Sequence, residues 1–303
     1  MNINDLVRGI LNGDKRSIAR AISIVENSDD EQRKNIIDKI YDYGNSKIIG
    51  ITGPPGVGKS TIIGNIAPML SKSGKISILA VDPASPFSGG SILGNRIRMQ
   101  ENLSKYDIYM RSTSNRLYEG GLSEYSWDII KILEASGSDF IIVETVGSGQ
   151  SDIDIMNVAD LTCVILAPGL GDEIQAVKSG MMEIGDVFIM NKMDREDAYI
   201  SIKDIMESLQ ISNKPNTPVI GLNSLTLDNY ESFIDFILKW NGKNTERRNI
   251  RKIRQIIIER IFTTYSVYIE SVDKNKLLGK NPYDIADDIM RNLDGLKNKY
   301  LEK

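Results

Sequence analysis

The sequence predicts an α/β protein in which a mainly parallel sheet is covered by helices and carries helical extensions at both ends. Two observations support this fold class. From residue 47 onward, short apolar runs alternate with stretches of helical character, and such apolar runs are typical of parallel strands buried on both faces. The residues that can carry chemistry directly follow these runs, and ligands of such sheets bind at the carboxyl ends of the strands.

The elements follow in chain order. Apolar residues at helical spacing over 3–25, interrupted at Asn12-Gly13, and a further stretch at 31–43 predict a helical extension over residues 1–46. Residues 47–242 hold the alternating region, and residues 243–303 are expected to form a helical C-terminal arm. After a first strand around Ile48–Ile51, strands are expected over 77–82, 107–112, 139–145, 161–168, 186–192 and 217–222. Helices are expected over 58–72, 122–136, 173–184, 196–209, 229–240, 246–271 and 282–299.

The composition excludes several classes of protein. The net charge is −4, with 41 acidic against 37 basic residues, so the chain has no electrostatic footprint for nucleic acid. No apolar run approaches the roughly 20 residues of a membrane span, and the first residues lack the uninterrupted apolar core of a secretion signal. We therefore expect a cytoplasmic protein that binds neither nucleic acid nor a membrane.

Cys163 is the only cysteine, and histidine is absent. Disulfides, Cys/His metal centres and His-based triads are therefore excluded within one chain. Cys163 lies in the apolar run LTCVIL and is expected to be a small buried residue.

A glycine-rich loop follows the first apolar run. Gly53 to Ser60 has the form Gly-x-x-x-x-Gly-Lys-Ser, with a predicted strand before it and a predicted helix after it. The glycines let main-chain N–H groups turn inward, and with the start of the helix these groups form a phosphate cradle. Lys59 can reach the outer phosphates, and the Ser60 hydroxyl can ligate Mg²⁺. The motif predicts a P-loop NTPase with the phosphate-binding residues Gly53, Pro54, Pro55, Gly56, Val57, Gly58, Lys59, Ser60 and Thr61.

The tetrapeptide NKMD, which follows the apolar run DVFIM, indicates which base is bound. The Asp194 carboxylate can accept two hydrogen bonds from the N1–H and the exocyclic amine of guanine, whereas adenine has no such pair of donors. Asn191 can tie this turn to the phosphate cradle, and the Lys192 stem can cover the base. After the next strand, Asn223-Ser224-Leu225 can offer backbone N–H groups to the base oxygen.

Magnesium requires oxygen ligands near the outer phosphates. Besides Ser60, the sequence offers Asp82 at the end of SILAVD and Glu144 at the end of FIIVE. Glu144-Thr145-Val146-Gly147 also has the spacing of a switch in which the Gly147 N–H senses the γ-phosphate. We expect Lys59 and Glu144 to be catalytic, Ser60, Asp82 and Glu144 to hold Mg²⁺, and the loops 83–99, 146–154 and 168–179 to move.

Longer motifs carry a resemblance to a known family. VDPASPFSGGSILGNRIRM, VETVGSGQSD, PGLGDEIQAVKSGMMEIGD and NKMD, in this order, resemble the methylmalonyl-CoA mutase-associated G proteins of the MeaB/ArgK family. NGDKRSIARAISIVEN resembles the helical prefix of that family, and NPYDIADDIM resembles a motif of its C-terminal arm. The resemblance covers nearly the whole chain.

The resemblance implies a parallel-sheet G domain, a homodimer formed by the C-terminal arm, and GTP hydrolysis that is slow alone and faster with a partner. The partner would be an adenosylcobalamin-dependent acyl-CoA mutase of the methylmalonyl-CoA mutase type, whose cofactor loading and protection the G protein gates. It also implies a switch, containing Asp172, Glu173 and Lys178, that senses the mutase. Gln150 lies in the second switch, but three residues after Gly147, so the water-positioning role is not assigned to it.

The chain departs from the family pattern at Asn95, where the family usually has an acidic residue. An amide keeps the oxygen but loses the charge, which would weaken a switch contact to Mg²⁺. The stretch RSTSNRLYEGGLSEYS also matches the family only in part.

Two alternatives share the phosphate loop. One is a P-loop kinase or ATPase of a lysine/arginine/ornithine transport system, a name used in this family, although NKMD argues against ATP as the natural substrate. The other is a nickel-insertion G protein, which the absence of histidine and the single cysteine disfavour.

Overall fold

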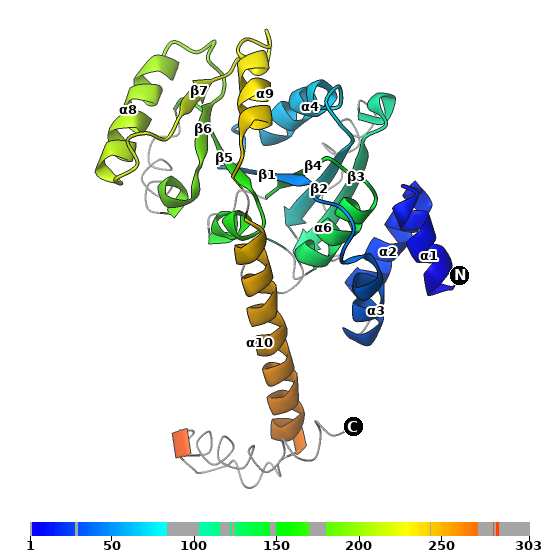
Figure 1. Cartoon of the computed structure of the whole chain (residues 1–303). Helices are drawn as coiled ribbons and strands as arrows, with labels where there is room; N and C mark the ends of the chain where they lie inside the picture. Colours follow the sequence, from blue (N-terminus) through cyan, green and yellow to red (C-terminus); the bar gives the residue numbers. More distant parts are fainter. Residues whose placement is uncertain are drawn as a thin grey trace. The chain divides into compact units, whose positions relative to one another are not determined.

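The computed structural model describes residues 2–27, 30–83, 103–115, 122, 125–145, 150–169, 180–242, 244–271, 281 and 283–284. Within these residues the strands form one sheet in the order β3-β2-β4-β1-β5-β6-β7, and every pair of neighbours is parallel (Figure 1). The parallel α/β fold expected from the sequence is therefore confirmed. The strands are β1 (Lys47–Thr52), β2 (Ile76–Pro83), β3 (Tyr109–Asn115), β4 (Phe140–Glu144), β5 (Leu161–Leu166), β6 (Val187–Met190) and β7 (Val219–Gly221).

Successive residues of a strand pack into different apolar clusters, one on each face of the sheet. In β1, Ile49 and Ile51 belong to the cluster that includes α4 (Lys59–Leu70) and α9 (Tyr230–Lys239). Ile48 belongs to the other cluster, and this alternation follows from the two-residue period of a strand. Figure 1 shows α4 and α9 together on one side of the sheet. The second cluster includes residues of α1 (Ile3–Leu11), α2 (Lys15–Asn27), α3 (Asp30–Ile40), α6 (Ser126–Ala135), the 3-10 segment η2 (Gln150–Asn157) and α8 (Ala198–Ile211).

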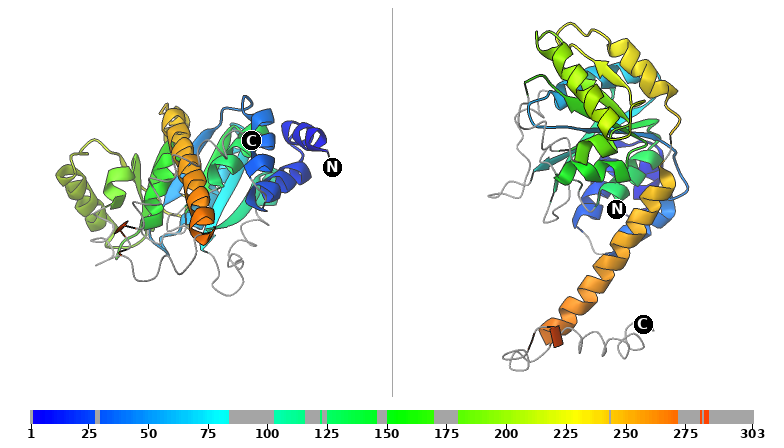
Figure 2. Two further views of the ribbon diagram at one scale, coloured as in Figure 1. Left: turned by 90° about the horizontal axis from the view of Figure 1, so that it is seen from below. Right: turned by 90° about the vertical axis from the view of Figure 1, so that its left-hand side faces the viewer.

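The two edges of the sheet carry different helices. The predicted N-terminal helices are present as α1–α3, which pack beside α6 near the β3 edge, while α8 lies beside β6 and β7 (Figures 1 and 2). The Arg111 guanidinium of β3 forms an ion pair of 2.5 Å with Glu26 of α2. The N-terminal helices are thus attached to the edge strand by a partly buried charge pair as well as by apolar contacts.

Several predicted boundaries differ from those observed. Strand β3 begins at Tyr109, not at residue 107, because Asp107 has a left-handed φ of 55° after the short 3-10 turn η1 (Ser104–Tyr106). Strand β6 ends at Met190, since Lys192, predicted as strand, also has a positive φ of 59°. Of the predicted helix 173–184, the described residues 180–184 are helical, and the predicted helix 282–299 lies outside the described residues except for 283–284.

The chain divides into two compact units, residues 1–248 and 249–303. The long helix α10 (Thr245–Ser271) begins in the first unit and continues in the second. None of the helices in the described part of the chain combines the length and the hydropathy that a membrane span requires.

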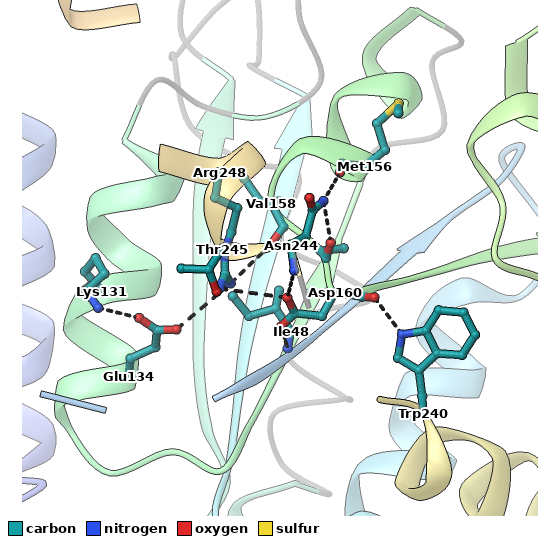
Figure 3. A network of polar contacts seen from close by, with 11 residues as sticks. Ile48, Lys131, Glu134, Met156, Val158, Asp160, Trp240, Asn244, Thr245 and Arg248 are labelled. Carbon is teal, nitrogen blue, oxygen red and sulfur yellow. Dashed lines mark hydrogen bonds and ion pairs between the residues drawn. The ribbon is translucent and has the colours of Figure 1, made fainter. Parts of the chain in front are cut away.

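The first turn of α10 is held in the first unit by a polar network around Asp160 (Figure 3). The buried carboxylate accepts the backbone N–H of Ile48 at 3.0 Å and that of Asn244 at 2.7 Å, and Arg248 lies 3.8 Å away. The Asn244 amide donates to the carbonyl oxygens of Met156 and Ala159, at 2.7 and 3.0 Å. The Asp160 carboxylate therefore joins the first strand to the start of α10, and the Asn244 side chain joins the start of α10 to η2 and to the residues just after it.

Candidate nucleotide-binding site

The loop after β1 has the backbone of a phosphate cradle. Gly58 caps the N-terminus of α4 with φ 98°, so the first main-chain N–H groups of a twelve-residue helix face the loop. Gly53 has φ 139°, and a Cβ at this position would lie 2.1 Å from the carbonyl oxygen of Ile165 in β5. Glycine is required at Gly53 by both backbone conformation and space, because the loop leaves the sheet against its neighbouring strand.

Lys59, the first residue of α4, reaches back across this loop. Its side chain is buried, and Nζ donates to the carbonyl oxygens of Gly53 at 2.6 Å and Pro54 at 3.0 Å. A cationic group is thereby held inside the loop, within reach of the place where the main-chain N–H groups converge. This arrangement suits the binding of a polyanion.

Ser60 and Glu144 meet at the junction of two strands. The register of β1 and β4 places Ile51 beside Glu144, and the Ser60 hydroxyl donates to the buried Glu144 carboxylate at 2.7 Å. One residue further along, the Thr145 hydroxyl donates to that of Thr52 at 2.9 Å. Motif reasoning did not identify this second pair, which ties together the two chain segments that enter the phosphate loop and the predicted switch.

The turn Asn191–Asp194 lies directly on the phosphate loop. The buried Asn191 side chain donates to the Val57 carbonyl oxygen at 2.8 Å, as expected from the sequence, and Lys192 Nζ donates to the Gly56 carbonyl oxygen at 2.9 Å. Asp194, in the same turn, is exposed to solvent. The predicted base-reading turn and the predicted phosphate cradle are therefore joined by two hydrogen bonds.

The segment Asn223–Leu225 is organised differently from the expectation. Asn223 Oδ1 accepts the N–H of Leu225 at 3.0 Å, which forms an Asx turn and engages an amide that we expected to face the base. Ser224 contacts the base-reading turn through its side chain, since its hydroxyl donates to Asn191 Oδ1 at 2.7 Å.

The remaining predicted residues lie at the edge of the described structure or beyond it. Asp82 belongs to β2, two residues past Ala80, which pairs with Glu144, and Gln150 is the first residue of η2. The expected switch residues Asn95, Gly147, Asp172, Glu173 and Lys178 lie outside the described residues.

Cys163 is fully buried in β5, as predicted. Burial in apolar surroundings raises the pKa of its thiol well above the usual value. A thiolate at this position is therefore disfavoured, and Cys163 is a core residue rather than a nucleophile or metal ligand.

Sequence comparison places these features in one family of proteins. The profile of the family described as "Methylmalonyl Co-A mutase-associated GTPase MeaB" matches residues 18–266. A protein of Pyrococcus horikoshii, provisionally named a GTPase, is 38% identical over 316 residues, covering 97% of this chain and 99% of that protein. GTPase ArgK of Escherichia coli is 34% identical over 196 residues, covering 63% of this chain and 59% of that protein. The methylmalonic aciduria type A homolog of Caenorhabditis elegans is 34% identical over 209 residues, covering 64% and 52%.

Solved structures show the same fold. The crystal structure of a LAO/AO transport system kinase matches with a TM-score of 0.65 and 20% identity, covering 97% of this chain and 99% of that one. HypB from Helicobacter pylori, solved in complex with nickel, matches with a TM-score of 0.50 and 21% identity, covering 69% and 93%. At such identities the likeness concerns the fold alone.

Proposed function

The chain belongs to the MeaB family of methylmalonyl-CoA mutase-associated GTPases, and we propose that it gates an adenosylcobalamin-dependent acyl-CoA mutase by hydrolysing GTP. In this proposal, binding and hydrolysis of GTP control cofactor loading and protection of the mutase. The contact between the phosphate loop and the turn that contains Asp194 is the observation that carries the nucleotide half of the proposal. The family description and the name of the Caenorhabditis elegans relative support the mutase half.

Guanine recognition is assigned to the turn Asn191–Asp194. Asn191 and Lys192 fix the turn on the phosphate loop, at 2.8 and 2.9 Å, so the Asp194 carboxylate is carried at a set distance from the cradle. A base attached to phosphates in the loop meets this carboxylate, which accepts hydrogen bonds from guanine but finds no matching donor pair on adenine. Ser224 supports the turn from the neighbouring loop through its bond to Asn191, and we assign the segment Asn223, Ser224 and Leu225 to the base side of the nucleotide site.

Phosphate binding is assigned to Gly53–Thr61, with Lys59 supplying positive charge. A phosphate oxygen can replace the carbonyl acceptors that Lys59 Nζ has at 2.6 and 3.0 Å in this structure. The hydrolysis needs little covalent help from the protein, because positioning and charge stabilisation dominate phosphoryl transfer. Main-chain N–H groups and Lys59 hold the triphosphate in an orientation in which a water molecule can attack the γ-phosphate.

The oxygens of Ser60 and Glu144 fit a magnesium ion. Mg²⁺ prefers hard oxygen ligands, and these two side chains present oxygens 2.7 Å apart beside the phosphate loop. We assign them to the metal together with Asp82. When bound, Mg²⁺ neutralises charge on the outer phosphates.

A homodimer is part of the proposal, and α10 supports it. The helix exposes Ile250, Ile253, Ile257, Ile258 and Ile261, each with 43–60% of its surface accessible. Ile250, Ile253 and Ile257 follow the spacing of a helix-pairing stripe. Replacing Ile253 and Ile257 by Asp should convert a dimer to a monomer, measured by light scattering, and a wild-type monomer at micromolar concentration would contradict this part.

The mutase half is tested by turnover. Gln150 is not assigned the water-positioning role, so any further group that stabilises the transition state would come from the mutase or from a rearranged switch. GTP turnover should rise when the acyl-CoA mutase of the same cell is added. If no adenosylcobalamin-dependent acyl-CoA mutase from that cell accelerates turnover or co-purifies with the chain, the partner assignment is wrong.

Neither alternative gains support from the site. The likeness to a transport-system kinase and to HypB is one of fold, at 20% and 21% identity. In the described residues no group of three His, Cys, Asp or Glu side chains could hold a metal ion, and the chain contains no histidine.

A further inference from the structure

A chain of side-chain hydrogen bonds links α4 to the base-reading turn. Asn65 of α4 donates to the hydroxyl of Tyr230, the first residue of α9, at 3.2 Å. The Tyr230 and Ser224 hydroxyls are 2.8 Å apart, and Ser224 donates to Asn191 Oδ1 at 2.7 Å. Because Asn191 donates in turn to Val57 of the phosphate loop, the path returns to the segment that leads into α4.

The direction of every bond in this path is determined by the number of protons available. Asn191 uses its N–H₂ group on Val57, so its Oδ1 must accept, and the single Ser224 proton is committed to it. Tyr230 must therefore donate to Ser224, which leaves the Tyr230 oxygen to accept from Asn65. All donors point the same way, and such chains of hydrogen bonds polarise and strengthen one another.

Because Tyr230 is buried, losing the hydrogen bonds of its hydroxyl would leave buried polar groups without partners. Tyr230 is 1% exposed and Asn191 is 2% exposed, whereas Asn65 and Ser224 are half-buried. The Tyr230 ring packs in the apolar cluster with α4 and α9, a role that phenylalanine could also fill. The apolar packing does not require the Tyr230 hydroxyl, which instead forms hydrogen bonds with both Asn65 and Ser224.

We propose that Tyr230 is a positioning residue for guanine recognition, acting through Ser224 and Asn191. This inference rests on the proposed reading of guanine by the turn that contains Asp194. The Tyr230 hydroxyl fixes the Ser224 hydroxyl, which fixes the Asn191 amide and so the placement of the turn over the phosphate loop. Breaking the path loosens the base contact and leaves Lys59, Ser60 and Glu144 unaltered.

Tyr230→Phe separates the two halves of the site. The variant should bind GDP about fivefold more weakly, the effect of one lost buried hydrogen bond, and bind inorganic pyrophosphate as wild type does. KM for GTP should rise by the same factor with kcat unchanged. Tyr109→Phe is the matched control, because it removes the hydroxyl of a partly buried tyrosine on the β3 edge strand and should leave all of these values unchanged.

Asn65→Leu provides a second test on a half-buried helix position. Its effect on GDP affinity should be smaller, about twofold, since Tyr230 can still donate to Ser224. Because the bonds act in series, the double variant should bind GDP no more weakly than Tyr230→Phe alone.

Three results would overturn the inference. These are unchanged GDP affinity in Tyr230→Phe, equal loss of GDP and pyrophosphate affinity, or additive losses in the double variant. Failure of the wild-type chain to bind GDP would instead remove the proposed function, and this inference with it.

Discussion

At the scale of single residues, Gly53 carries two constraints at once. It leaves β1 with φ 139°, and a Cβ would stand 2.1 Å from a backbone oxygen of β5, which cannot move without breaking the sheet. Gly56 in the same loop also has a positive φ, 75°, but its Cβ would meet nothing within 4 Å. A side chain at Gly53 would meet both a steric clash and an unfavourable left-handed backbone, whereas one at Gly56 would meet only the unfavourable backbone. Comparing substitutions at the two positions therefore isolates the cost of the clash.

Gly53→Ala should lower the free energy of unfolding by about 3 kcal/mol or more, because the sheet or the loop has to shift. Gly56→Ala is the matched control and should lower it by only about 1–2 kcal/mol, the cost of the left-handed conformation. Denaturant unfolding of both variants measures the difference. Equal losses would show that β5 does not constrain the loop.

Asp186 is a residue whose charge opposes folding. Burial raises the pKa of its carboxyl above the usual value, against the opposing effects of the Thr162 N–H bond at 2.8 Å, Lys214 and Arg247. The folded chain therefore holds the proton more strongly than the unfolded chain, and ionisation at neutral pH lowers stability. Asp14 behaves in the opposite sense, because hydrogen bonds from the Ser17 side chain and backbone lower its pKa.

Asp186→Asn should raise thermal stability at pH 7, since the amide can still accept from Thr162, and this gain should shrink as the pH falls toward about 4. Asp14→Asn, the control of opposite sign, should lower stability at pH 7, and because the pKa of Asp14 is lowered in the folded chain, this loss should persist at about pH 4 and disappear only at lower pH. Melting temperatures between about pH 2 and 8 measure both. A gain for Asp186→Asn that persisted at the lowest pH would show that its cause is not the charge.

At the scale of elements, the start of α10 is fixed by Asn244. Its side-chain amide donates to the carbonyl oxygens of Met156 in η2 and of Ala159 just after η2, and its backbone N–H donates to the Asp160 carboxylate (Figure 3). Arg248 adds a contact of 3.4 Å to the Val158 carbonyl oxygen. Asn244 and Arg248, at the start of the C-terminal helix, therefore bind the carbonyl oxygens of the segment that follows the predicted switch.

Asn244→Ala should destabilise the first unit by about 2 kcal/mol, because two carbonyl oxygens lose their donor. Asn27→Ala removes a single exposed bond, to the Ser23 carbonyl oxygen at 2.8 Å, and should cost about 0.5 kcal/mol or less. Hydrogen exchange should show faster opening of residues 150–160 in Asn244→Ala and unchanged exchange in the strands of the sheet. Identical exchange in the two variants would argue against the role given to Asn244.

At the scale of the whole molecule, the sequence predicts the contacts that short motifs encode. The glycine loop, the strands beside it and the approach of Asn191 to Val57 follow from local pattern and from the parallel sheet. The Tyr230 hydroxyl bonds do not, because Asn65 and Tyr230 are 165 residues apart and Tyr230 has the spacing of a core residue. The bond of the Leu225 amide is local but also escapes the motif, since the Asn223 side chain accepts it in an Asx turn.

The central claim is that Asp194 makes this phosphate loop a guanine-nucleotide site. Calorimetric titration of the wild-type chain with GTP and with ATP, each with Mg²⁺, tests it most directly. GTP should bind at least about tenfold more tightly than ATP, and Asp194→Asn should lose that preference and gain affinity for the xanthine nucleotide. Equal affinity for GTP and ATP, or an unchanged preference in Asp194→Asn, would contradict the account.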